Sequence, residues 1–326
     1  MNADRLHECT VIGLKNERKS SVNIQFKDWI TNNLDSQKGK TVLITGANSG
    51  IGFYTALALA SAGADVIMAG RNEDKINTAI KLIEKENISG TVEAGVVDLA
   101  SLKSVRSFSE YIKSKHTRLD ILVNNAGVMM TPESKTEDRF ELQFGVNFLS
   151  HFALTGLLYG LLNSTSNSRV VTLSSLAHRG ASIDFNNFKI EKPYDARREY
   201  YQSKLANIIF ALELGKKINA NKDSILSVAC HPGFTKTDLQ RHLDPKMIEG
   251  MVFMDAWQGS LSAIVAATKV DVQPGDYYGP DGKNEMGGFP ALAIIDDAAL
   301  DNEIANRLWH EAQEYTGVTY PDTQTV

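Results

Sequence analysis

The chain has 326 residues, and its 34 Lys and Arg stand against 39 Asp and Glu, which gives a formal net charge of -5. This balance, with no block of basic residues, excludes nucleic acid as the expected partner. Two cysteines, Cys9 and Cys230, lie far apart without a metal-ligand or redox spacing, so we expect free thiols, a reducing compartment and no metal site.

Residues 1–39 are polar and form a predicted N-terminal extension to a domain at 40–326. Met1–Ser20 lacks the apolar core of a signal peptide, and no later run reaches the ~20 apolar residues of a membrane span. We therefore expect no membrane span and a cytoplasmic location. The stretch 24–30 predicts a short amphipathic helix that packs on the domain, and a membrane-surface role for its apolar side chains is the alternative.

A glycine turn follows the first predicted strand, 41–44, and leads into an apolar helix that starts near Phe53. Backbone without Cβ atoms lets a ligand come close, and the unpaired N–H groups at the helix start favour a phosphate or pyrophosphate. The glycine spacing differs from the Gly-x-Gly-x-x-Gly fingerprint, so a tight turn without a ligand is the alternative. The expected binding residues are Gly46, Asn48, Ser49, Gly50, Ile51 and Gly52.

Arg71 comes directly after the second predicted strand, 65–70. In a dinucleotide fold this strand end faces the adenosine ribose, where an acidic residue would bind a 2′-hydroxyl and an arginine a 2′-phosphate. The sequence therefore favours NADP over NAD. The alternative is that Arg71 caps the next segment or pairs with Glu73 or Asp74.

After a charged helix at 74–87, a third strand at 91–97 ends in Asp98 and Leu99, which are placed to meet the adenine edge. The alternative for Asp98 is that it caps the helix at 102–111, and the two roles can coexist.

The fourth predicted strand, 119–123, ends in the small residues Asn125, Ala126 and Gly127. Small residues at a strand end let the backbone run against a ligand, and asparagine side chains can tie neighbouring strands together. We assign these three residues to the cofactor site.

A fifth strand at 169–173 is followed by Ser174 and Ser175, and further on Tyr200 and Lys204 stand four residues apart. On a helix this spacing puts the two side chains on one face, where an ammonium favours the phenolate and would tune the phenol towards neutral pH. The ordinary alternatives are a serine turn and a lysine stem that covers a tyrosine ring.

Five motifs now stand in order along the chain: Gly46-x-x-x-Gly50-Ile51-Gly52, Asn124-Asn125-Ala126-Gly127, Ser174-Ser175, Tyr200-x-x-x-Lys204 and His231-Pro232-Gly233. Over about residues 39–290 this order resembles that of the short-chain dehydrogenases/reductases. The runs 200–207 and 231–237, with the long insert between Ser175 and Tyr200, look like the retinol dehydrogenase group. Many members of that group carry a membrane-anchoring amino terminus, which we do not expect here.

The resemblance implies a catalytic set of Asn147, Ser175, Tyr200 and Lys204. Ser175 would hydrogen-bond the substrate oxygen, Tyr200 would exchange a proton with it, and Lys204 would also bind the nicotinamide ribose. Asn147 would hold a water that leads protons away from the lysine, and the alternative for it is a contact with another helix. Tyr200, Lys204, Pro232, Gly233 and Thr235 complete the implied cofactor site, and Thr237 is an alternative to Thr235 at the pyrophosphate.

Residues 236–256 form the predicted substrate-variable segment, and its apolar residues among charges favour a helical lid over an apolar pocket. An ordinary packed helix pair is the alternative. The remaining expected elements are a strand at 225–230, a helix at 257–268, a last strand and turn at 276–282 and a surface-packed helix at 302–315. His178 and His231 are expected to be structural.

The predicted fold is a single Rossmann-type, doubly wound α/β domain with about seven parallel strands and a small helical lid. The predicted function is NADP-dependent hydride transfer between a lipophilic alcohol and its aldehyde or ketone. A non-catalytic dinucleotide-binding sensor or scaffold and a light-dependent enzyme of the protochlorophyllide reductase type are the alternatives. The resemblance also implies a homodimer or homotetramer, although the two terminal segments could each block or create such an interface.

Overall fold

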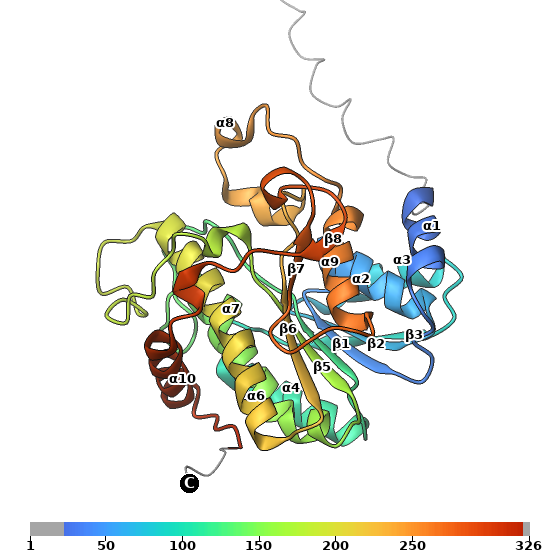
Figure 1. Cartoon of the computed structure of the whole chain (residues 1–326), viewed down its shortest axis with the longest axis horizontal. Helices are drawn as coiled ribbons and strands as arrows, with labels where there is room; N and C mark the ends of the chain where they lie inside the picture. Colours follow the sequence, from blue (N-terminus) through green and yellow to red (C-terminus); the bar gives the residue numbers. More distant parts are fainter. Residues whose placement is uncertain (1–22, 322–326) are drawn as a thin grey trace, which may run out of the picture.

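The computed structural model describes residues 23–321, so Cys9 and the stretch tested for a signal peptide lie outside the described residues. A sheet with strand order β3-β2-β1-β4-β5-β6-β7-β8 runs through the centre of the molecule (Figure 1). The parallel strands are β1 Thr41–Thr45, β2 Asp65–Gly70, β3 Thr91–Val96, β4 Ile121–Asn124, β5 Ser168–Leu173, β6 Ile225–Cys230 and β7 Tyr277–Pro280. The eighth strand, β8 Pro290–Leu292, pairs with β7 in the antiparallel sense.

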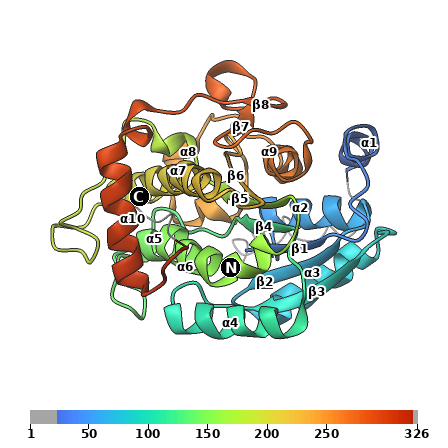
Figure 2. The ribbon, with the colours of Figure 1, turned by 60° about the horizontal axis from the view of Figure 1, so that its bottom comes forward.

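Helices cover both faces of the sheet, and each face buries its own hydrophobic cluster (Figure 2). The helices of one face are α1 Ile24–Asn33, α2 Gly50–Ser61, α3 Glu73–Glu84 and α9 Ala256–Thr268. Those of the other are α4 Leu102–Lys115, α6 Ser150–Asn163, α7 Ala196–Asn221 and α10 Asn302–Thr316. The short segments are α5 Leu142–Phe144, η1 Gly145–Leu149, η2 Leu176–His178, η3 Asp238–His242, α8 Pro245–Ile248, η4 Lys283–Glu285 and η5 Asp297–Ala299.

The strand order reverses between β1 and β4, because β1 pairs with β2 on one side and with β4 on the other. In open α/β sheets, this reversal opens a crevice at the carboxyl ends of the strands, where ligands bind. The doubly wound fold is thereby confirmed. The predicted strand number was close, but the short antiparallel β8 was not predicted, since three residues carry too little pattern to be seen in a sequence.

The amphipathic helix predicted at the start of the domain is α1, and it packs as expected. Phe26 is fully buried, with its ring 5.2 Å from that of Tyr54 on α2 and 5.9 Å from that of Trp257 on α9. This contact confirms the packing interpretation for α1.

One helical run among the described residues, Leu142–Asn163, is long and apolar enough to cross a membrane by length and composition. The expectation that no run would reach such a length was therefore wrong for this segment. Its most apolar window is 78% buried in the fold, where it packs between the sheet, α4, α7 and α10. A core helix passes the same test, so the run is explained by burial inside the domain.

Two local predictions need correction. Ser101, not Asp98, is the N-cap of α4, and the Asp98 carboxylate instead accepts the backbone N–H of Ala100. The lid predicted as a helix is mostly irregular: it holds only the single turns η3 and α8 and returns to the domain where Thr235 pairs with Met254. The alternative of an ordinary packed helix pair is also wrong.

Candidate active site

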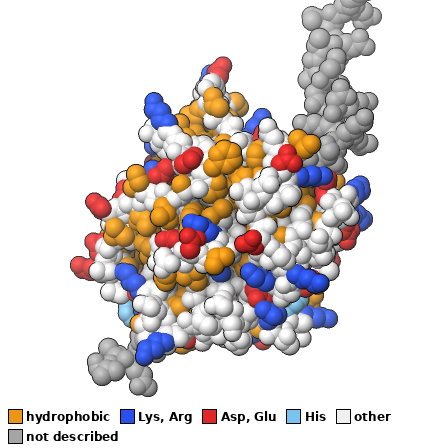
Figure 3. All heavy atoms as spheres, turned by 45° about the vertical axis from the view of Figure 1, so that its right-hand side comes forward, with side chains coloured by type: hydrophobic (Ala, Val, Ile, Leu, Met, Phe, Trp, Pro, Cys, Tyr) orange, Lys and Arg blue, Asp and Glu red, His pale blue; other side chains and the backbone are white. Residues whose placement is uncertain are grey.

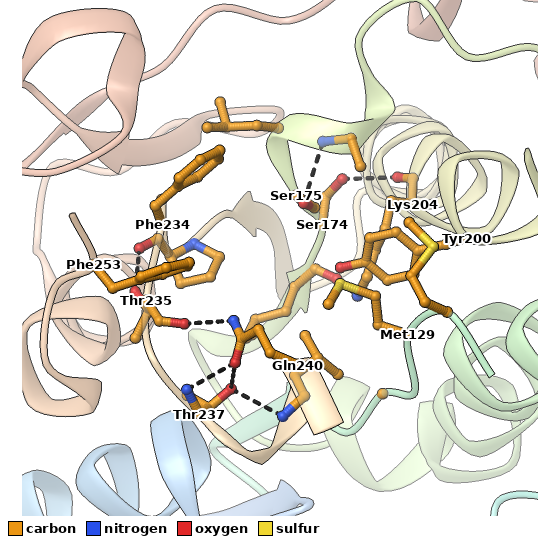
Figure 4. A pocket seen from close by; sticks show the side chains of 18 of the residues that line it. Met129, Ser174, Ser175, Tyr200, Lys204, Phe234, Thr235, Thr237, Gln240 and Phe253 are labelled. Atoms are coloured by element: carbon orange, nitrogen blue, oxygen red, sulfur yellow. Dashed lines mark hydrogen bonds between the residues drawn. The ribbon is translucent and has the colours of Figure 1, made fainter. Parts of the chain in front are cut away.

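A cavity of about 610 Å³ opens at the carboxyl ends of the strands, between the glycine turn, α7 and the segment 236–256. Figure 4 shows Ser175, Tyr200 and Lys204 on one side of it and Phe234 and Phe253 on the other. Most of the lining is apolar, and its polar groups converge on one region, as in a small-molecule site. The predicted residues that line it are Ile51, Asn125, Gly127, Ser175, Tyr200, Lys204, Pro232, Gly233 and Thr235.

The glycine turn is closely packed against the loop after β4. A Cβ on Gly52 would lie 2.5 Å from the Gly46 carbonyl oxygen and 2.5 Å from Asn125 Nδ2. Gly46 has a φ of +67°, and the Asn125 side-chain amide donates to the Thr45 carbonyl at 2.6 Å. Glycine is therefore required here for the turn itself, and the predicted tie between neighbouring strands is present.

Helix α2 begins at Gly50 with a free positive end. Its N-cap residue, Ser49, makes no side-chain capping bond, and the first turn holds no acidic residue. The N–H groups of that turn thus have neither a cap nor a carboxylate to satisfy them, which suits a phosphate. The donor set fits the pyrophosphate of a dinucleotide.

Arg71 is exposed at the end of β2 and makes no ion pair or side-chain hydrogen bond among the described residues. Both ordinary alternatives are therefore wrong: Asn72 caps α3, and neither Glu73 nor Asp74 pairs with the arginine. Asn48 Oδ1 lies 3.4 Å from where a Cβ on Gly70 would be, so the glycine turn adjoins the strand end that carries Arg71. Among the described residues nothing occupies this guanidinium, so it is available to an anionic ligand at this end of the crevice.

Asp98, Leu99 and several turn residues do not line the cavity. Leu99 is buried, and its carbonyl accepts the Ser150 hydroxyl at 2.5 Å. The other predicted site residues outside the lining are Gly46, Asn48, Ser49, Gly50, Gly52, Arg71, Ala126 and Asn147. All but Asn147 belong to the glycine turn, the β2 end or the β4 loop, which extend from the cavity along the crevice.

The two serines after β5 point to different partners. Ser174 is buried and donates to the Lys204 carbonyl at 2.7 Å, which ties β5 to α7. Ser175 lines the cavity, as Tyr200 does, and its hydroxyl accepts the Ala177 N–H at 3.2 Å. Both serines border the cavity, but the Ser174 hydroxyl is used by the Lys204 carbonyl, so Ser175 is the better placed of the two to bind a ligand.

Tyr200 and Lys204 lie on one face of α7 and are both nearly buried, with 4% and 5% of their surfaces exposed. Lys204 Nζ lies 5.8 Å from the Tyr200 ring centre and donates to the Leu173 carbonyl at 3.2 Å. Burial raises the pKa of Tyr200 to about 12, and burial also lowers the pKa of Lys204 to about 8. Burial is the largest cause of the shift at Tyr200, and the tuning of the phenol by Lys204 towards neutral pH stays a prediction for the complex with cofactor.

Asn147 lies in the π-helical turn η1, fully buried behind the cavity wall. Its amide donates to the Val128 carbonyl and to the Ser203 hydroxyl, each at 2.9 Å, and its Oδ1 accepts the Val128 N–H at 2.8 Å. Both amide hydrogens are thus used, and the side chain holds the β4 loop against α7. The side chain of Asn147 therefore contacts another helix, which was the alternative from the sequence. Short π-helical turns such as η1 are frequent at functional sites.

Both histidines near the cavity have structural partners, as predicted. His178 Nδ1 lies 2.6 Å from the Ser175 carbonyl, and its Nε2 accepts the Asp296 N–H. His231 Nε2 lies 2.9 Å from the Glu285 carboxylate. Burial lowers the pKa of both imidazoles, so they are neutral at pH 7.

Between the two threonines, the structure favours Thr237 for contact with the glycine turn. Its methyl carbon lies 3.2 Å from where a Cβ on Gly50 would be. Thr235 also lines the cavity, but its hydroxyl donates to the Pro232 carbonyl at 2.8 Å. Sequence reasoning placed Thr235 in the site and kept Thr237 only as an alternative.

The lid does what its composition predicts, because it covers the cavity with apolar side chains. Leu239, Leu243, Ile248, Met251 and Phe253 line it. The projecting part at the top of Figure 3 shows hydrophobic side chains beside charged ones.

Several lining residues were missed from the sequence. Met130 has a φ of +51° and is held by the Gln143 side chain, which accepts its N–H at 2.7 Å. Asn284 and Met286 arrive from the β7–β8 connection, which no motif marks. Arg197 and Tyr201 are different, because they lie on α7 close to Tyr200 in sequence. Their helical spacing from Tyr200 is a signal that could have found them. The missed residues are Met129, Met130, Leu173, Ser174, Leu176, Ala177, Arg179, Arg197, Tyr201, Gln240, Asn284 and Met286.

No group of three potential ligands for a metal ion exists among residues 23–321. Instead, the glycine turn at the uncapped start of α2 lies beside a serine, a tyrosine and a lysine, namely Ser175, Tyr200 and Lys204. A doubly wound sheet with this set at its switch point is the arrangement of a nicotinamide-dependent oxidoreductase.

Comparisons with known proteins agree with this class. The sequence model of the family "short chain dehydrogenase" matches residues 40–248. Human retinol dehydrogenase 13 is 39% identical over 92% of this chain and 93% of its own, and human retinol dehydrogenase 14 is 37% identical over 86% and 87%. A crystal structure of an uncharacterized protein from Mycobacterium paratuberculosis superposes with a TM-score of 0.76, at 34% identity over 90% of this chain and 99% of that chain.

The chain belongs to the short-chain dehydrogenase/reductase family, within its retinol dehydrogenase-like group. It is an NAD(P)-dependent oxidoreductase that acts on alcohols.

Proposed function

We propose that the protein transfers hydride between NADP(H) and a lipophilic alcohol or its aldehyde or ketone, with Tyr200 as the acid/base. The observation that carries this proposal is that Ser175, Tyr200 and Lys204 meet in one largely apolar cavity next to the glycine turn. The names of the relatives make retinol and its aldehyde the first substrates to test.

The nicotinamide cofactor supplies or accepts the hydride when bound. The chain offers it donors at the start of α2, small residues in the β4 loop, and the Pro232–Thr235 backbone. Lys204 is the cation nearest to Gly127 and would bind the ribose, and Arg71 would bind the 2′-phosphate.

Ser175 donates its hydroxyl to the substrate oxygen and holds it beside the phenol. Because burial raises the pKa of Tyr200 to about 12, the phenol is protonated at neutral pH. It is therefore ready to give its proton to the oxygen of a carbonyl, and this state favours reduction. The lid keeps water away from the site and meets the apolar part of the substrate.

The pH profile of reduction is expected to follow Lys204. Burial lowers its pKa to about 8, so its ammonium form, which binds the ribose, is present below that pH and is lost above it. We expect kcat/KM to be level below about pH 8 and to fall about tenfold per pH unit above it. A Lys204→Arg variant keeps its charge, and its residual activity should not fall over this range. A level wild-type profile up to about pH 10 would contradict the assignment.

Replacing Arg71 with Asp tests the cofactor preference. Losing charge-assisted bonds to a 2′-phosphate should weaken NADPH binding tens-fold or more, about 2 to 4 kcal/mol, and leave NADH binding much less affected. Nicotinamide fluorescence in titrations of both proteins with both cofactors gives the dissociation constants. Equal binding of NADPH and NADH by the wild type would exclude Arg71 as the phosphate ligand.

A cytoplasmic location and self-association as a homodimer or homotetramer complete the proposal. The location rests on the composition of the chain, and the oligomeric state on the family resemblance. Sedimentation of the purified protein tests the second.

A further inference from the structure

Arg197 lines the cavity from the first turn of α7, three residues before Tyr200. Residues three apart on a helix are neighbours on its surface. The guanidinium of Arg197 therefore stands at the rim of the cavity, near the group that is proposed to react.

The charges on the cavity wall are unbalanced. Three basic residues and no acidic residue line it. Arg179 is neutralised, because its guanidinium lies 2.5 Å from the Glu285 carboxylate. Lys204 belongs to the catalytic set, so Arg197 is the cation that the proposed chemistry leaves unused.

The Arg197 guanidinium makes no ion pair or hydrogen bond to any residue of 23–321. Its neighbour Arg198 shows the contrast, since its guanidinium binds the buried Glu199 carboxylate at 2.5 Å. Asp195 lies close to Arg197 but uses its carboxylate to cap α7, where it accepts the backbone N–H groups of both arginines.

Arg197 is nevertheless held in place, because its Cζ lies 5.0 Å from the ring centre of Tyr201, which also lines the cavity. A guanidinium stacked on a ring keeps its edge free to bind a planar carboxylate with two bonds. A cation in the first turn of a helix is repelled by the positive end of the helix dipole. A bound anion would offset this repulsion.

We propose that Arg197, stacked on Tyr201, is a carboxylate subsite, and that the preferred substrate is an amphipathic oxo acid or hydroxy acid. This inference rests on the proposed function. The carbonyl lies at Ser175 and Tyr200, the apolar chain lies against the lid, and the carboxylate reaches Arg197. The reaction itself is unchanged: the carbonyl gains hydride and a proton and becomes the alcohol.

The test compares oxo fatty acids, with the carboxylate ~2 to 6 carbons from the carbonyl, with their methyl esters. With NADPH and wild-type protein, the best acid should exceed its ester in kcat/KM by about tenfold or more. In Arg197→Gln the acid-to-ester ratio should fall to about one. Arg241→Gln removes an exposed arginine of the lid that does not line the cavity, and should keep the wild-type ratio.

Equal turnover of acids and esters, or a preference that survives Arg197→Gln, would overturn the subsite and leave the proposed function standing. If no carbonyl is turned over, the proposed function fails, and calorimetry with the same acids and esters on Tyr200→Phe protein decides the subsite. Tighter binding of the acid that Arg197→Gln removes supports it, and equal binding of acid and ester overturns it.

Discussion

Replacing Tyr200 with Phe should lower kcat about 10²- to 10⁴-fold, because the variant keeps the ring and loses the proton donor. The ring is nearly buried and lines the cavity beside Ser175, so the change removes one oxygen from an otherwise intact wall. Steady-state oxidation of NADPH with a lipophilic aldehyde measures the effect.

The matched control is Tyr315→Phe, which removes a phenol that bonds Glu311 on helix α10, and neither residue lines the cavity. Its kcat should equal that of the wild type. If Tyr200→Phe turns over as fast as the control, another group donates the proton. A sensor or scaffold, the alternative from the sequence, would bind NADPH and show no turnover in any of the three proteins.

Replacing Gly52 with Ala should destabilise the fold by about 2 kcal/mol or more and abolish tight NADPH binding. The new Cβ would meet the Gly46 carbonyl oxygen at 2.5 Å, and backbone cannot move aside as a flexible side chain can. The glycine turn must therefore shift, and the start of α2 shifts with it. Denaturant unfolding gives the stability, and fluorescence titration gives the affinity.

Gly160→Ala is the control for this substitution, since Gly160 also lies inside a helix and an added Cβ would meet nothing within 4 Å. It should raise the free energy of unfolding by about 0.5 to 1 kcal/mol. If Gly52→Ala is as stable as the wild type and binds NADPH normally, the glycine turn is not the rigid cradle described here.

Much of the fold was predictable because parallel strands buried on both faces are short apolar runs, and glycine and serine mark their ends. The spacing of Tyr200 and Lys204 has a chemical meaning of its own, and the resemblance to the short-chain dehydrogenases/reductases implied Ser175. The carboxyl ends of β5 and β6 meet at one edge, so motifs far apart in sequence were expected to converge there, and they do.

The remainder depends on tertiary packing that local patterns do not record. Nothing in the sequence shows that Asn284 and Met286 reach the cavity from the β7–β8 connection. The spacing of Tyr200 and Lys204 is visible in the sequence, but their burial, which raises the pKa of the phenol and lowers that of the ammonium, is not. The N-cap of α4 is Ser101 and not Asp98. Both residue types suit an N-cap, so the sequence alone does not distinguish between them.

The most direct test of the proposed chemistry uses NADPH that carries deuterium at the reactive carbon of the nicotinamide. It is incubated with a lipophilic aldehyde such as retinal and with wild-type or Tyr200→Phe protein. Mass spectrometry of the alcohol should find one deuterium on the carbinol carbon with the wild type, and about 10²- to 10⁴-fold slower formation of the same product with the variant. Unlabelled alcohol, or no alcohol from any lipophilic aldehyde or ketone, would contradict hydride transfer at this site.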